Sequence, residues 1–218
     1  MNVAMPIVFL IAGGAAGALA RRLLSRARSP APVPFFAVVA TTGALSAVVA
    51  WRQGSGAWPA WWLPVPLLVT FLAVPLAITD LRYRRLPDVL TVPAYPLCGL
   101  ALVMAALSGA GGGLVARAVA GGLLFGGAHL VVHLMSRRSL GAGDVKLAGV
   151  LGTALAAVGW AALVVGAAVA ALVTVLLALR HRWRRNGVPH GPGLLAATWL
   201  VTVFPGTGSE VVRFGWAR

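Results

Sequence analysis

The acidic residues are the side chains most able to do chemistry in this 218-residue chain, which has only four of them: Asp80, Asp88, Asp144 and Glu210. Asp80 ends one long apolar stretch, and Asp144 begins another. A carboxylate at a helix C-terminus is disfavoured by the helix dipole, so helix formation alone does not account for Asp80. Two converging aspartates can share a proton, so that one activates a water and the other polarises a carbonyl. If they converge, Asp80 and Asp144 form a candidate metal-free hydrolytic pair.

The elements that must position these side chains are predicted to be membrane-spanning helices. The chain is 60% hydrophobic and only 10% charged, too little charge to cover the surface of a soluble domain. A bilayer core of roughly 30 Å needs about 20 apolar residues per helix. We therefore expect an all-α, polytopic membrane protein, a single domain over 1–218, with seven spans as the competing count. The eight expected spans are 3–20, 35–51, 60–79, 89–107, 114–135, 145–157, 161–179 and 191–205. Two arrangements are open for the short span 145–157: a tilted helix, or a hairpin with 161–179 around Gly159-Trp160.

The positive charges predict the orientation of the chain. A net charge of +14 could indicate nucleic-acid binding, but the basic residues are confined to short loops between apolar stretches, so no nucleic-acid partner is expected. Four alternate loops contain most of them, and positive loops are typical of the cytosolic side. This places both termini outside and Asp80, Asp88 and Asp144 at the cytosolic face, next to anionic lipid headgroups. The basic residues of these loops are Arg21, Arg22, Arg26, Arg28, Arg82, Arg84, Arg85, Arg137, Arg138, Lys146, Arg180, Arg182, Arg184 and Arg185. Glu210 lies alone in the predicted outer tail.

Simpler roles remain open for two of the aspartates. Asp88 follows Pro87 at a helix start, and Asp144 also begins a helix, so each could cap its helix. Gly141 and Gly143 precede Asp144, however, and would let backbone come closer than a cap requires. Asp80 and Asp144 could also relay protons or bind cations in a transporter, since intramembrane carboxylates are functional in pumps too.

Two motifs around these aspartates resemble the type IV prepilin peptidases, which are membrane-embedded aspartate proteases. The first is Asp80-Leu81-Arg82-Tyr83-Arg84-Arg85-Leu86-Pro87-Asp88-Val89-Leu90-Thr91. The second is Gly141-Ala142-Gly143-Asp144-Val145-Lys146-Leu147, which is similar to the family's Gly-x-Gly-Asp-x-Lys signature. A weaker third match, Val188-Pro189-His190-Gly191-Pro192, is similar to a Pro-x-Gly-Pro segment. The resemblance covers about residues 65–205.

The resemblance implies a function and a role for each residue. Asp80 and Asp144 would be the catalytic pair, and Gly141 and Gly143 would shape the approach of the second aspartate. Lys146 would support the site electrostatically, with Pro87 and Asp88 in structural positions. The substrate would be a prepilin or pseudopilin, whose basic leader is removed at the cytosolic face of the inner membrane without a cofactor. Methyltransferase activity, known in bifunctional members, is not expected, because those usually carry paired CxxC motifs and this chain has one cysteine, Cys98.

Two further points bear on this expectation. His129 and His133 lie four residues apart and could bind a metal, but no third ligand is evident, so packing is favoured and no metal site is predicted. A basic leader would also be repelled by a basic cytosolic face. Recognition would then have to come from the pilin's apolar helix docking between spans.

Overall fold

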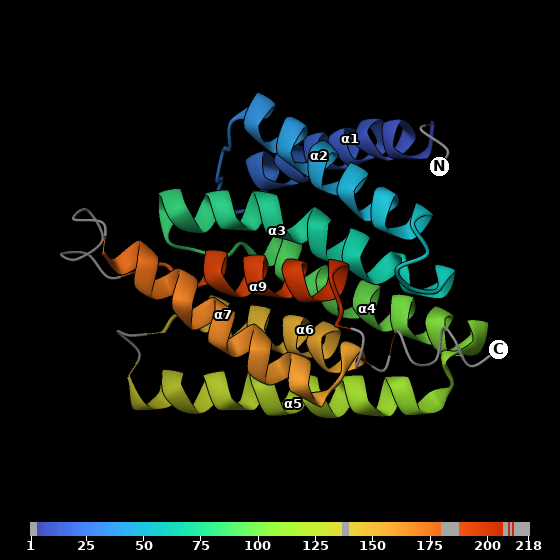
Figure 1. Ribbon diagram of the computed structural model, residues 1–218. Helices are drawn as coiled ribbons and strands as arrows, with labels where there is room; N and C mark the ends of the chain where they lie inside the picture. Colours follow the sequence, from blue (N-terminus) through green and yellow to red (C-terminus); the bar gives the residue numbers. More distant parts are fainter. Residues whose placement is uncertain (1–3, 137–139, 180–187, 207–208, 210, 212–218) are drawn as a thin grey trace.

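The computed structural model describes residues 4–136, 140–179, 188–206, 209 and 211, and in these segments it contains helices and no strands (Figure 1). Eight α-helices are described. They are α1 (Ala4–Arg26), α2 (Phe35–Gly54), α3 (Pro64–Tyr83), α4 (Asp88–Ala105), α5 (Gly112–Met135), α6 (Ala142–Val158), α7 (Trp160–Ala178) and α9 (Gly191–Val203). A 3-10 turn, Ala60–Trp62, precedes α3, and a π-helical turn, Ala106–Ala110, extends α4.

Each described α-helix overlaps one of the eight predicted spans, so the all-helical, polytopic fold class is confirmed. Six of these helical segments are long and apolar enough to cross a membrane, whereas α6 and α9 are shorter. Successive helices run in alternating directions, so the start of α1 and the end of α9 lie at the same end of the bundle (Figure 1). Of the two arrangements open for the short span, the α6–α7 hairpin is the one that forms. Its turn is Gly159 alone, at φ 155°, a backbone conformation that side chains rarely tolerate.

Prolines occur inside two of the buried helices, at Pro75 in α3 and at Pro93 and Pro96 in α4. Neighbouring helices and local adjustments of the backbone make such prolines tolerable in a membrane bundle. The π-helical turn after α4 contains Gly109, where φ is 122°, and Gly111 follows the turn with φ 77°. The glycine-rich linker from Ser108 to Gly113 is thus partly helical rather than an ordinary loop.

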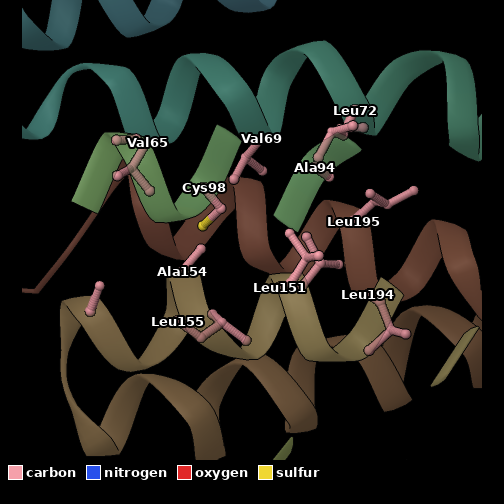
Figure 2. Close-up of a cluster of buried hydrophobic side chains, with 14 of the residues drawn as sticks. Val65, Val69, Leu72, Ala94, Cys98, Leu151, Ala154, Leu155, Leu194 and Leu195 are labelled. Carbon is pink, nitrogen blue, oxygen red and sulfur yellow. The ribbon is translucent and has the colours of Figure 1, made fainter. Parts of the chain in front are cut away.

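The core lies between α3, α4, α6 and α9 (Figure 2). Val69 and Leu72 of α3, Cys98 and Ala94 of α4, and Leu151 of α6 belong to one buried cluster. Although α6 has only 17 residues, it is buried along most of its length. The α1–α2 hairpin covers α3 at one edge of the bundle, and α5 lies at the opposite edge (Figure 1).

Helices α5 and α6 pack tightly through small residues. A Cβ added at Gly121 would lie 2.0 Å from the Ala156 Cβ, and one at Gly126 would lie 3.0 Å from the Gly149 Cα. Without a hydrophobic force between helices in lipid, such close backbone approach is a main source of association. Gly127 is different, because its added Cβ would meet nothing within 4 Å.

Polar side chains close the ends of the two short helices. Arg117 of α5 donates to the carbonyls of Ala156 (2.8 Å) and Ala157 (3.0 Å), which are among the unpaired carbonyls at the end of α6. The indole of Trp58 donates to the Val203 carbonyl (3.2 Å) at the end of α9. These bonds let both helices end inside the bundle with their carbonyls satisfied.

Candidate active site

Asp80 lies in the last turn of α3 and is only 5% exposed. The helix ends at Arg84, which adopts a left-handed conformation at φ 53°, and the Arg84 N–H donates to the Asp80 carbonyl (2.9 Å). This is the backbone geometry of a left-handed C-cap, usually formed by glycine. The chain therefore turns away at Arg84, one helical turn after Asp80, while the Asp80 carboxyl stays buried against the bundle.

Asp144 lies in the first turn of α6. Its Oδ2 accepts a hydrogen bond from the Gly141 N–H (3.1 Å), so it does cap the helix. Its Oδ1 is buried and has no hydrogen-bond partner among the described residues. Buried polar atoms are nearly always paired, so a cap accounts for only one of the two carboxylate oxygens.

The two aspartates come together at one end of the bundle. The charge of Asp144 acts on the carboxyl of Asp80, more strongly than that of Arg84. The start of α9 also reaches this point: the Gly191 N–H donates to Asp80 Oδ2 (3.0 Å), and the charge of His190 acts on Asp144. Side chains separated by 64 positions in the sequence are thus joined through a third segment.

Glycines and one leucine shape the space around the pair. A Cβ at Gly191 would lie 2.8 Å from Asp80 Oδ2 and 3.2 Å from Leu86 Cδ2. A Cβ at Gly143 would lie 3.1 Å from Leu86 Cβ. Leu86 is buried between these two glycines. Gly143 therefore makes room for the loop that follows α3, and Gly141 contributes its N–H to Asp144.

Lys146 and Asp88 form a separate ion pair. Lys146 Nζ lies 2.8 Å from Asp88 Oδ1, with both side chains about half exposed or more. The Tyr95 hydroxyl donates to the Lys146 carbonyl (2.7 Å), which adds a second link between α4 and α6. Pro87 precedes α4, and its carbonyl accepts from Leu90 and Thr91. Lys146 and Asp88 thus connect helix starts beside the aspartate pair, and the Lys146 ammonium is bound to Asp88.

These aspartates and their surroundings lie in a region with a known counterpart. A family model described as the type IV leader peptidase family matches residues 67–179. The chain belongs to that family. The match includes both aspartate motifs, and it ends before α9, so it does not include the Gly191 contact to Asp80.

Individual relatives of this chain have names more specific than that of the type IV leader peptidase family. The chain is 31% identical over 164 residues to the prepilin leader peptidase/N-methyltransferase of Aeromonas hydrophila, covering 72% of this chain and 53% of the relative. It is 32% identical over 181 residues to the protein of the same name from Aeromonas salmonicida strain A449, covering 79% of this chain and 58% of the relative. The chain thus spans little more than half the length of these relatives. No solved structure gives a significant match.

Four residues at the site were not predicted as functional: Leu86, His129, His190 and Gly191. His190 and Gly191 lie in the third, weaker sequence match, which was the signal that could have found them. His129 and His190 line a cavity of about 310 Å³ between α5, α7 and α9, and both act electrostatically on Asp144. Nothing local in the sequence indicates Leu86.

The two histidines four residues apart are used for packing contacts. His129 Nδ1 donates to the Phe125 carbonyl (2.8 Å), and His133 Nδ1 donates to the Leu140 carbonyl (2.7 Å). The described residues contain no group of three or more side chains suited to hold a metal. Arg137, Arg138, the cluster Arg180–Arg185 and Glu210, which entered the sequence predictions, lie outside the described residues.

Proposed function

We propose that this chain is an aspartic endopeptidase that removes the basic leader of prepilin-like or pseudopilin-like substrates. The observation that carries the proposal is the meeting of the buried Asp80 carboxyl, at the end of α3, with the partly buried Asp144 carboxyl, at the start of α6. Membership of the type IV leader peptidase family and the name of the relatives, prepilin leader peptidase/N-methyltransferase, support the choice of substrate. The proposal is limited to the peptidase step, and N-methylation is not part of it.

The chemistry needs only the two carboxyls and a water. Like charges in close proximity cannot both ionise easily, so the pair shares one proton. The ionised carboxylate takes a proton from the water, and the water oxygen attacks the scissile carbonyl carbon. The protonated carboxyl donates its proton to the carbonyl oxygen. Collapse of the tetrahedral intermediate breaks the C–N bond, and the leaving amine takes up a proton. The Gly141 and Gly191 N–H groups keep one oxygen of each carboxyl fixed during these steps.

We place the site at the cytosolic face of the inner membrane. The described arginines and the lysine lie at the same end of the bundle as Asp80 and Asp144, except for Arg52 and Arg117. Clustered positive charge is typical of the cytosolic side and of contact with anionic headgroups. A cytosolic, lipid-facing position of the basic residues accounts for the net charge of +14 without a nucleic-acid partner. The alternative of a proton- or cation-coupled transporter gains no support from the family assignment.

Co-expression with a prepilin tests the proposal. Asp80→Asn and Asp144→Asn are each expected to lower leader removal by at least about 10²-fold, because general acid–base catalysis contributes on that order. Glu210→Gln makes the same carboxylate-to-amide change in the fourth acidic residue and should process like the wild type. Cleavage is followed by the size shift of the substrate on a gel, with the amount of each variant in the membrane measured in parallel. Leader removal that survives either aspartate substitution would contradict the proposal.

A further inference from the structure

Helices α4 and α5 are neighbours in the chain but make few contacts with each other, and each packs instead on α6. The result is an open cavity of about 590 Å³ between α4 and α5, with α6 as its floor. We call it the α4–α5–α6 groove. Its lining is almost entirely apolar, including Leu102, Val119 and Leu130.

The groove is elongated along the bundle. Its lining residues on α5 run from Val115 to Leu130, which corresponds to about 22 Å at 1.5 Å per residue. This is a large part of the roughly 30 Å hydrocarbon core. The groove is therefore long enough for an apolar helix or a lipid acyl chain that lies parallel to α5.

Glycines distinguish a helix from a lipid chain as the occupant. Five of them line the groove: Gly99 on α4, Gly122, Gly126 and Gly127 on α5, and Gly149 on α6. A Cβ at Gly99 or Gly127 would meet no atom within 4 Å, so packing inside this chain does not explain these two. Small residues at a membrane-exposed surface allow another helix to approach closely. A flexible acyl chain gains little from such a surface.

One end of the α4–α5–α6 groove lies beside the start of α6, next to the aspartates. Val145, which directly follows Asp144, lines the groove together with Lys146 and Tyr95. The carboxylate of Asp88 is paired with Lys146 at this end and is 63% exposed. It is the one exposed acidic side chain among the described residues. A basic segment that continues from an apolar helix would reach this carboxylate in competition with Lys146, whereas the other loops at this end carry basic side chains that repel it.

We propose that the α4–α5–α6 groove binds the apolar transmembrane helix of the substrate and presents the preceding basic leader to Asp80 and Asp144. This inference rests on the proposed function and specifies how it selects its substrate. A second cavity of about 470 Å³, between α2, α3 and α9, also reaches the site through Pro192. It has no glycine in its lining, and we assign it no substrate.

The first test fills the groove without disturbing the bundle. Gly127→Leu adds a side chain where a Cβ has open space, and Ala128→Leu makes a similar addition one residue along α5, on an exposed position outside the groove. Ala196→Leu fills the second cavity. We expect Gly127→Leu to slow cleavage of a full-length prepilin at least about tenfold, which corresponds to 1.4 kcal/mol. The other two variants should process like the wild type. Wild-type processing by Gly127→Leu, equal loss in Ala128→Leu, or loss confined to Ala196→Leu would overturn the inference.

The second test reports binding without cleavage, so it also distinguishes failure of the groove from failure of the proposed function. A photo-crosslinking residue replaces Val119, which lines the groove, or Ala120, which is exposed on α5 outside it. Both are placed in the Asp80→Asn background with an intact prepilin in the same membrane. We expect substrate adducts from position 119 and at most background from position 120. Adducts of equal yield from both positions, or adducts with lipid alone, would overturn the inference even if the wild type cleaves the prepilin.

Discussion

Gly191 sets the position of the Asp80 carboxyl. Its N–H donates to Asp80 Oδ2 (3.0 Å), and its missing side chain leaves space that Asp80 and Leu86 occupy. The residue lies 111 positions from Asp80 and precedes a proline at the start of α9. Positioning of the reacting groups within an ångström is worth large rate factors in enzymes. A glycine in this place is therefore expected to matter for activity more than for folding.

Gly191→Ala tests this at the residue scale. The added Cβ would lie 2.8 Å from Asp80 Oδ2, so the carboxyl must move, and we expect leader removal to fall by about 10²-fold. Gly206→Ala, with no atom within 4 Å of its added Cβ, is the matched control and should retain wild-type processing. Thermal unfolding in detergent micelles separates a loss of activity from a loss of stability. If Gly191→Ala cleaves at the wild-type rate, the contact with Asp80 is not part of the machinery.

Among the elements, α6 is fixed to its neighbours at both ends. Arg117 binds its last carbonyls, and the Tyr95 hydroxyl binds the Lys146 carbonyl near its start. Gly149 makes this second contact possible, because a Cβ there would lie 2.3 Å from the Tyr95 hydroxyl oxygen. The helix that carries Asp144 thus depends on a close contact with α4.

A double-mutant cycle measures the contact between α4 and α6. Gly149→Ala overpacks the interface and should destabilise the protein by about 1–3 kcal/mol. Tyr95→Phe loses one hydrogen bond, worth about 1 kcal/mol. The double variant removes the oxygen that clashes and should be more stable than Gly149→Ala alone, as judged from unfolding temperatures in detergent. Strictly additive losses would show that the two residues do not compete for the same space.

At the scale of the whole molecule, charge is segregated between the two ends of the bundle. The described basic side chains beside the aspartates lie in the last turns of α1 and the loop after it, at the end of α3 and the loop after it, and at the start of α6. Arg52 and Arg117 lie at the other end. Both of these bind backbone carbonyls, Arg52 that of Val203 and Arg117 those of α6. The positive charge gathered beside the aspartates favours a cytosolic position for that end.

Cysteine labelling tests the orientation. In a Cys98→Ala background, Ser55→Cys and Arg28→Cys each place one exposed thiol, at opposite ends of the bundle. We expect a membrane-impermeant maleimide to label position 55 in intact spheroplasts and position 28 only after lysis. The reverse pattern would place Asp80 and Asp144 outside, and equal labelling before lysis would indicate mixed orientations.

The sequence predicted the elements better than the contacts between them. The spans follow from apolar run length, which is a local property, and so does the turn at Gly159. The motifs identified Asp80 and Asp144, but their convergence was assumed. Three features depend on how helices distant in the sequence pack, which no local pattern encodes. They are the hydrogen bond from Gly191 to Asp80, the burial of Leu86 and the α4–α5–α6 groove. Lys146 was expected to support the site electrostatically, and its ion pair with Asp88 could be seen only in the structure.

If the bundle spans the membrane as proposed, the location of Asp80 in the last turn of α3 and of Asp144 in the first turn of α6 places the pair near the boundary of the bilayer. A substrate whose apolar helix is anchored in the same bilayer then offers whichever peptide bond lies at that depth. Hydrophobic mismatch between the helix and the hydrocarbon layer shifts this position, because a longer helix tilts or protrudes. Membrane thickness would thus help to select the cleaved bond, together with the residues on either side of it.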